Sequence, residues 1–116
     1  MSYEGSCHCG AVAFEVDAPV PTQAMSCNCS HCRRKGFLLS FVPEGQFKLK
    51  QGQDQLRSYF FHAHKIEHMF CATCGTQSFA RGAMPDGTPM RAVNLRCVPS
   101  IDLDALQLKR VDGASF

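Results

Sequence analysis

Hydrophobic and polar residues alternate along several short segments of the chain. In the segment VAFEVD, the side chains of Val12, Phe14 and Val16 alternate with smaller or acidic ones. A period of two is typical of a β-strand with one buried face. Because proline cannot continue a strand's hydrogen bonding, the prolines of the following APVP segment are expected to end it.

The next hydrophobic residues predict two more strands, Phe37–Val42 and Phe47–Lys50. The residues Pro-Glu-Gly between them are typical of a turn. Two strands joined by such a short turn favour a β-hairpin. We therefore expect these two segments to pair with each other.

The second half of the chain continues the same pattern. Two runs rich in Tyr, Phe and Ile flank the sequence HAHK and predict another hairpin, and the segment QSFARG adds a short strand. In MRAVNLRCV, the residues Val93, Leu95 and Cys97 share one face, which indicates a half-buried strand.

Helical signals are scarce by comparison. One helical turn is expected at Ser30–Lys35, and another within SIDLDALQL, where Ser100 or Asp102 could act as the cap. Many short strands with turn signals between them favour a mainly β fold of short antiparallel strands with little helix. Residues 1–116 have the length of a single domain, and 45% hydrophobic and 19% charged residues are typical of a globular one.

The eight cysteines add chemistry to this picture. The N-terminus lacks the basic and apolar regions of a secretory signal, and no segment is apolar for long enough to cross a bilayer. We therefore expect a cytoplasmic protein that does not enter membranes. Clustered cysteines in a reducing compartment indicate metal binding rather than disulfides.

The net charge does not favour nucleic acid as a partner. The formal charge of +2 would become negative if seven thiolates held two zinc ions. The only basic run is the short RRK segment at residues 33–35, whereas binding along a phosphate backbone needs an extended basic surface.

Two cysteine pairs are typical of a structural zinc site. Cys7 and Cys9 form a C-x-C pair, and Cys71 and Cys74 form a C-x-x-C pair followed by Gly75. Tetrahedral zinc takes four ligands, and a C-x-x-C turn lets two sulfurs bind one ion while backbone N–H groups point at them. These four cysteines are the expected ligands of a zinc ion that stabilises the fold.

Cys27, Cys29 and Cys32 form a C-x-C-x-x-C motif that can place three sulfurs around a second zinc ion. Three protein ligands with an open fourth position are typical of a reactive zinc. Cys97 could close the site instead, although its phase with neighbouring apolar residues favours a core position. His31 could also close it, although it directly precedes Cys32 and its ring is expected to point away.

The other histidines are weaker candidates. His8 lies between two expected ligands and is interpreted as a surface group or as a partner of the ligands. His62, His64 and His68 lie on the predicted hairpin and are interpreted as solvated or hydrogen-bonded strand residues. A role for His62 or His64 in proton transfer is only an alternative to water.

The order GSCHCGAVAFEV, CNCSHCRRKG, FCATCGTQSF, VNLRCV and a terminal DG resembles the glutathione-dependent formaldehyde-activating enzymes, a family that includes centromere protein V. The resemblance covers almost the whole chain. It implies a fold like that of the small zinc-bearing Rab-release factors. It also implies a structural zinc on the first and third motifs and a catalytic zinc on the middle one, which agrees with the partition above.

The resemblance further implies a carbon–sulfur lyase-like enzyme that joins the thiol of glutathione to formaldehyde, giving S-hydroxymethylglutathione. The substrates would be a small thiol and an aldehyde, and a zinc ion would deprotonate the thiol. Arg33 and Arg34 could bind a carboxylate of the thiol through bidentate contacts, although a solvated basic turn is the simpler reading. The alternative function is a non-enzymatic zinc module for protein interaction or for sensing thiols or metal.

Overall fold

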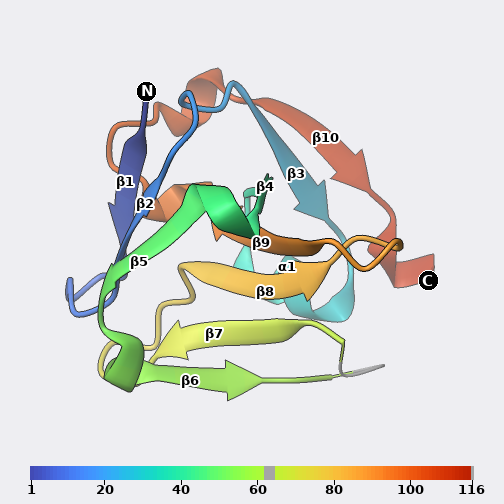
Figure 1. The fold of residues 1–116 in the computed structure, drawn as a ribbon. Helices are drawn as coiled ribbons and strands as arrows, with labels where there is room; N and C mark the ends of the chain where they lie inside the picture. The colour runs from blue at the N-terminus through green and yellow to red at the C-terminus, as the bar shows by residue number, and fades with distance from the viewer. Residues whose placement is uncertain (62–64, 116) are drawn as a thin grey trace.

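The computed structural model of the protein describes residues 1–61 and 65–115. This part of the chain folds into short strands, one α-helix and several 3-10 turns (Figure 1). The helix α1 spans Ser30–Lys35. The strands are β1 Tyr3–Ser6, β2 Ala13–Val16, β3 Gln23–Cys27, β4 Leu39–Pro43, β5 Phe47–Gln51, β6 Leu56–Tyr59, β7 Glu67–Cys71, β8 Phe79–Ala83, β9 Pro89–Asn94 and β10 Gln107–Val111.

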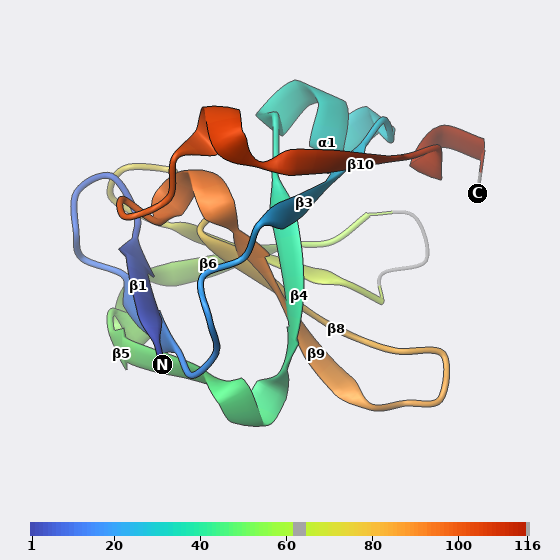
Figure 2. The same cartoon turned by 90° about the horizontal axis from the view of Figure 1, so that it is seen from above.

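The strands form two sheets. The smaller has the order β1-β2-β5, and the larger has the order β10-β3-β4-β9-β8-β7-β6. The prediction of a mainly β fold with little helix is confirmed. One pairing departs from the antiparallel arrangement, because β10 runs parallel to β3, with Gln107 opposite Gln23 and Val111 opposite Cys27. Figure 2 shows these two strands side by side, leading toward α1 and the C-terminus.

The alternating residues of β2 fill the core between the sheets. Phe14 and Val16 are almost fully buried and pack in one cluster with Val93 and Leu95. The Phe14 ring also stacks on Phe47 of β5, with 5.2 Å between ring centroids. Burial of these apolar side chains is the main force that holds the small sheet against the large one.

The predicted hairpin of residues 37–50 is wrong, although both of its strands form. β4 pairs with β9 in the large sheet, whereas β5 pairs with β2 in the small one. Glu44–Gln46 forms a 3-10 turn between them instead of a tight hairpin turn. This crossing lets Phe47 pack against Phe14, so the chain leaves one sheet and enters the other.

Other sequence predictions fared better. The hairpin around residues 62–64 is confirmed by the antiparallel pairing of β6 and β7, although His62 and His64 lie outside the described residues. Helix α1 and the 3-10 turn that Asp102 caps are confirmed. The strand expected over residues 90–98 ends early, because the Asn94 side chain accepts a hydrogen bond from the Arg96 N–H and caps a 3-10 turn. Among the described residues, no helix has the length and apolar character needed to cross a membrane.

Candidate functional site: two cysteine clusters and an arginine pocket

Four cysteines from distant parts of the chain meet where the two sheets join. This four-cysteine cluster consists of Cys7, Cys9, Cys71 and Cys74, whose sulfurs all lie within 4.8 Å of one another. The Sγ–Sγ distance is 3.6 Å between Cys7 and Cys9 and 3.7 Å between Cys9 and Cys71. Four sulfurs held tetrahedrally at a Zn–S distance of about 2.3 Å would lie about 3.8 Å apart. The spacing therefore fits a tetrahedral ion.

The backbone around this cluster points N–H groups at sulfur. The Val12 N–H donates to Cys7 Sγ at 3.3 Å, and the Thr73 N–H donates to Cys71 Sγ at 3.4 Å. Gly75 closes the second turn by donating to the Cys71 carbonyl at 2.8 Å, with φ of +79°. A side chain at that φ would be strained, so the glycine suits the turn. Donors of this kind stabilise the negative charge of thiolate ligands.

The four-cysteine cluster ties the small sheet to the large one. Cys7 directly follows β1, and Cys71 ends β7. Both are almost fully buried and belong to a hydrophobic cluster with Val12, Met69 and Phe79. An ion at this point would crosslink segments 62 residues apart in the sequence.

The second group is local in sequence. This three-cysteine cluster consists of Cys27 at the end of β3, Cys29 at the N-cap of α1 and Cys32 within α1, with all three sulfurs within 4.8 Å. Cys29 Sγ accepts a hydrogen bond from the Cys32 N–H at 3.3 Å, and Cys27 Sγ accepts one from the Cys29 N–H at 3.4 Å. The strand-to-helix turn thus gathers three sulfurs without any other segment.

The three thiols differ in how readily they ionise. Burial raises the pKa of Cys32, and the neighbouring Cys29 and Cys27 sulfurs raise it further. Burial also opposes ionisation of Cys29, but hydrogen bonds from the backbone N–H groups of Cys32 and His31 outweigh it and lower the pKa of this thiol. Thiolates this close repel one another, so the three thiols ionise together only when a cation balances their negative charge.

The C-terminal segment covers the three-cysteine cluster because β10 runs beside β3. The Asn28 side chain donates to Asp112 at 3.0 Å and accepts from the Ala114 N–H at 3.0 Å. A Cβ built on Gly113 would collide with Cys27 Sγ. The backbone of Gly113 therefore packs directly against the cluster. A residue with a side chain at this position would displace Cys27.

The two alternatives for a fourth ligand lie elsewhere. Cys97 belongs to neither cluster. It is half-buried, and its Sγ donates to the Gln77 carbonyl at 3.9 Å. Burial raises the pKa of Cys97 to about 11, and the charges of Cys7 and Cys74 add to this effect. Cys97 therefore lies in the surroundings of the four-cysteine cluster.

His31 also belongs to neither cluster. Its ring packs among aromatic side chains, with centroid distances of 4.2 Å to His68, 5.0 Å to Phe61 and 5.5 Å to Phe37. Its Nδ1 is buried and has no hydrogen-bond partner among the described residues. The ring thus occupies an aromatic cluster beside the three cysteines.

His68, interpreted from the sequence as a solvated or hydrogen-bonded strand residue, is buried on β7. Gln77 Nε2 lies 3.4 Å from its Nδ1. This distance is that of a hydrogen bond between the two buried side chains. Burial lowers the pKa of His68 to about 4, and the nearby positive charges of His31 and Lys35 contribute. The imidazole is therefore neutral at physiological pH.

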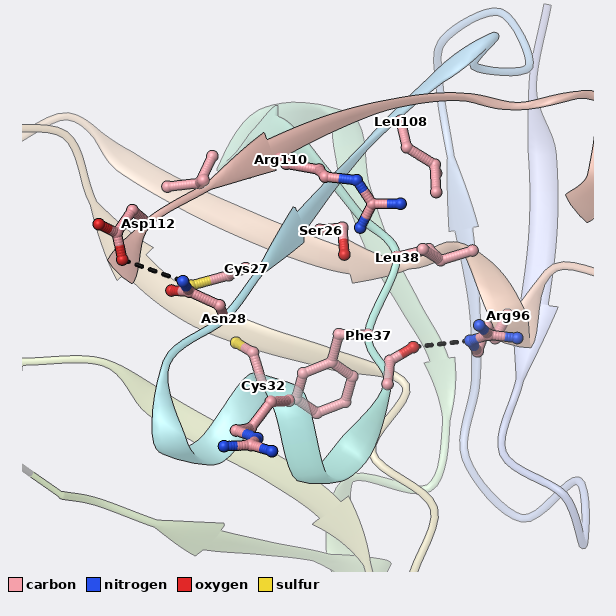
Figure 3. A pocket seen from close by; sticks show the side chains of 13 residues that line it. Ser26, Cys27, Asn28, Cys32, Phe37, Leu38, Arg96, Leu108, Arg110 and Asp112 are labelled. Carbon is pink, nitrogen blue, oxygen red and sulfur yellow. Dashed lines mark hydrogen bonds between the residues drawn. The ribbon is translucent and has the colours of Figure 1, made fainter. Parts of the chain in front are cut away.

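A cavity of about 510 Å³ borders Cys27 and Cys32 (Figure 3). Its lining includes Arg33, Arg96 and Arg110, so we call it the arginine pocket. In Figure 3, the Arg110 side chain extends over Ser26 toward the middle of the pocket. Three arginines among the lining residues favour an anionic ligand.

Little in the arginine pocket neutralises these charges. Among the described residues, its lining holds one carboxylate, that of Asp112, which accepts hydrogen bonds from Asn28 and Ser115. Arg96 Nε donates to the Gly36 carbonyl at 2.6 Å, as the dashed line in Figure 3 shows. Among the described residues, no ion pair is formed by Arg33 or Arg110. Both guanidinium groups are available to a ligand.

The sequence identified only part of this pocket. Of the two arginines that the sequence suggested, Arg33 lines it, whereas the Arg34 side chain is exposed and donates to the Ser30 carbonyl at 2.8 Å. Arg96 and Arg110 were missed, because strand pairing and a 3-10 turn bring them here from later in the chain.

Comparison with known proteins shows which family the chain belongs to. The family model described as glutathione-dependent formaldehyde-activating enzyme matches residues 2–105, a range that holds both cysteine clusters. The chain belongs to this family. The resemblance seen in the sequence is thereby confirmed.

One curated protein and one solved structure are similar to this chain. A curated protein of Halomonas elongata, whose description names the same family, is 31% identical over 84 residues, covering 66% of this chain and 54% of the relative. The chain thus spans about half the length of that relative. A crystal structure of a Rhodobacter sphaeroides protein matches with a TM-score of 0.77 at 26% identity, covering 91% of this chain and 99% of the other.

Proposed function

We propose that the protein binds two zinc ions, a structural one in the four-cysteine cluster and a reactive one in the three-cysteine cluster. Sulfur spacing near that of a tetrahedral site and N–H groups aimed at sulfur support the first. Three converging sulfurs with the same kind of N–H support favour the second. An all-sulfur donor set suits zinc among the common divalent metals.

The function that this arrangement supports best is carbon–sulfur bond formation or cleavage between a small thiol and an aldehyde. One observation carries it: the three-cysteine cluster has no fourth His, Cys, Asp or Glu ligand atom among the described residues, and it borders the arginine pocket. Zinc at such a site would supply a positive charge that favours an ionised thiol at neutral pH. The family name, with its glutathione and formaldehyde, agrees with this proposal.

The protein's own residues account for substrate binding. Arg33 and Arg110 are placed to bind the carboxylates of a glutathione-like thiol, which would hold its sulfur near Cys27 and Cys32. His68 is neutral at physiological pH, so its ring could accept a proton but carries no imidazolium proton to donate. Delivery of a proton to the carbonyl oxygen falls to water in this proposal. A non-enzymatic zinc module is disfavoured, because it would not need an arginine-lined pocket beside its second ion.

Exchange spectroscopy by NMR tests the proposed function. Zinc-loaded protein is expected to accelerate interconversion of glutathione with its formaldehyde adduct above the rate in buffer. The spectrum separates free and adduct thiol, so the exchange rate is measured at equilibrium. Rates equal to those in buffer, across several thiols and aldehydes, would leave the binding module as the better account.

Removing the arginine pocket's charges should weaken thiol binding. The double variant Arg33→Ala and Arg110→Ala is expected to raise the glutathione concentration for half-maximal exchange by about tenfold or more, which corresponds to about 1.4 kcal/mol or more. The reason is that each guanidinium loses a charge-assisted contact with a carboxylate.

Arg34→Ala is the control, because it removes one positive charge from the helix that carries Arg33, at a residue that does not line the pocket. It is expected to behave as the wild type. A neutral thiol without carboxylates should show no difference among the three proteins. Equal weakening by Arg34→Ala would mean that only overall charge matters, which contradicts a specific carboxylate site.

A further inference from the structure

A second cavity, of about 370 Å³, also borders the three-cysteine cluster. All three cysteines contribute to its lining, and so does Phe37, which it shares with the arginine pocket. The remaining lining is mostly apolar, so we call it the apolar pocket. Its apolar side chains include Met25, Leu39, Phe41, Ile66, Met84 and Met90.

The polar groups in this lining are already engaged with one another or with neighbours. His68 and Gln77 contact each other, and the Arg81 side chain lies 3.5 Å from the Glu67 carboxylate. No group here matches the two unpaired arginines of the neighbouring pocket. The arginine pocket therefore suits an anionic ligand group, whereas the apolar pocket suits an apolar one.

The mouth of the apolar pocket is apolar as well. Phe41, Ile66 and Met84 are about half exposed although they are large hydrophobic residues. Exposed apolar side chains around a concave site indicate a binding surface, because they gain free energy when a ligand removes them from water. These side chains and the three cysteines line the same cavity, so a ligand bound there would also lie against the three-cysteine cluster.

We propose that the carbonyl substrate carries a bulky apolar group, aromatic or branched aliphatic, that fills the apolar pocket. This inference rests on the proposed function, since it assigns the second substrate of the same site. Formaldehyde has no side chain to occupy the cavity. An apolar aldehyde would bury its side chain there and place its carbonyl carbon at the three-cysteine cluster, beside a thiol held from the arginine pocket.

The reaction balances without any further reagent. In the forward direction the thiol sulfur adds to the carbonyl carbon and a C–S bond forms. The π-electron pair of the carbonyl moves to oxygen, and the proton released by the thiol ends on that oxygen. In reverse, the C–S bond breaks and aldehyde and thiol are released. No atom is oxidised or reduced by an outside agent.

Two measurements on the zinc-loaded protein test this assignment. The first is the exchange rate with glutathione for cyclohexanecarbaldehyde and for formaldehyde, each divided by its rate in buffer. The acceleration is expected to be at least tenfold larger for cyclohexanecarbaldehyde. The second is a titration with the unreactive alcohol cyclohexylmethanol, followed through the NMR signals of methyl-labelled methionine. The methyls of Met25 and Met90 are expected to shift, while that of Met69, which lies outside this pocket, stays in place.

Two variants locate the effect. Ala92→Leu narrows the pocket, and Ile66→Lys places a charge at its mouth. Each is expected to reduce the preference for cyclohexanecarbaldehyde over formaldehyde by at least tenfold. Val20→Lys, also at an exposed apolar residue but outside the pocket, is the matched control and should retain wild-type values. Ile66 is exposed, so Ile66→Lys is expected to fold. It therefore still tests the inference if Ala92→Leu does not fold.

The outcomes separate this inference from the proposed function. Methyl shifts with cyclohexylmethanol but no acceleration with any aldehyde would support the apolar ligand class and refute the reaction. Acceleration with formaldehyde equal to or greater than that with cyclohexanecarbaldehyde would overturn the inference and leave the reaction in place. A dimer in sedimentation, with no methyl shift from the alcohol, would show that a second copy covers the pocket and would also overturn it.

Discussion

Cys74→Ala protein is expected to be unfolded or insoluble, and to lose the zinc ion of the four-cysteine cluster. The cluster joins the segment after β1 to the end of β7, so its ion would be part of the folding energy. Structural zinc sites in small peptides contribute roughly 10–16 kcal/mol at neutral pH, whereas a whole domain is stable by only about 5–15 kcal/mol. Circular dichroism and metal analysis of the purified protein measure the loss.

Cys97→Ala serves as the control for that experiment. Cys97 lies near Cys7 and Cys74 but belongs to neither cluster, so its replacement removes a thiol of similar surroundings without removing a ligand. It should fold and retain two zinc ions. A Cys74→Ala protein that folds with an unchanged melting temperature would contradict the structural role of the cluster.

Cys32→Ala is expected to lower the zinc content from two ions per chain to one and to reduce thiol–aldehyde exchange to the rate in buffer. The fold should persist, because Cys27, Cys29 and Cys32 lie within one strand-to-helix turn and crosslink no distant segments. Native mass spectrometry counts the ions, and a thermal melt checks the fold.

Cys97→Ala again provides the comparison, and it should keep both ions and full exchange. If it released the same ion as Cys32→Ala, Cys97 would be a ligand of the second site. The open coordination position, and with it the proposed reaction, would then lose its support.

Local patterns in the sequence predicted local structure well. Alternation predicted β2, and the runs rich in Tyr, Phe and Ile on either side of HAHK predicted the β6–β7 hairpin. The strands β1, β3 and β10 were not predicted. In β10, all residues but the last are exposed. The strand has no buried face, so its sequence does not alternate between apolar and polar residues. The wrong hairpin arose because a turn signal between residues 43 and 46 does not say which sheet the next strand joins.

The candidate site shows the same division. The spacing of the cysteines was sufficient to predict both clusters, because C-x-C and C-x-x-C spacings bring neighbouring sulfurs close together. The two pockets were beyond that reasoning. Arg110 reaches Cys27 through the parallel pairing of β10 with β3, and Arg96 comes from the turn after β9. No periodic pattern in the sequence relates these residues to Cys32.

The central claim is that the three-cysteine cluster holds a metal ion with a position open to a thiol. Cobalt-loaded protein tests it most directly, because the visible absorption of cobalt depends on its ligands and geometry. With two cobalt ions bound, glutathione is expected to change the absorption of one ion at a one-to-one ratio, without releasing metal, and to cause no change in Cys32→Ala. An unchanged spectrum of the wild-type protein, with both ions still bound, would contradict the claim.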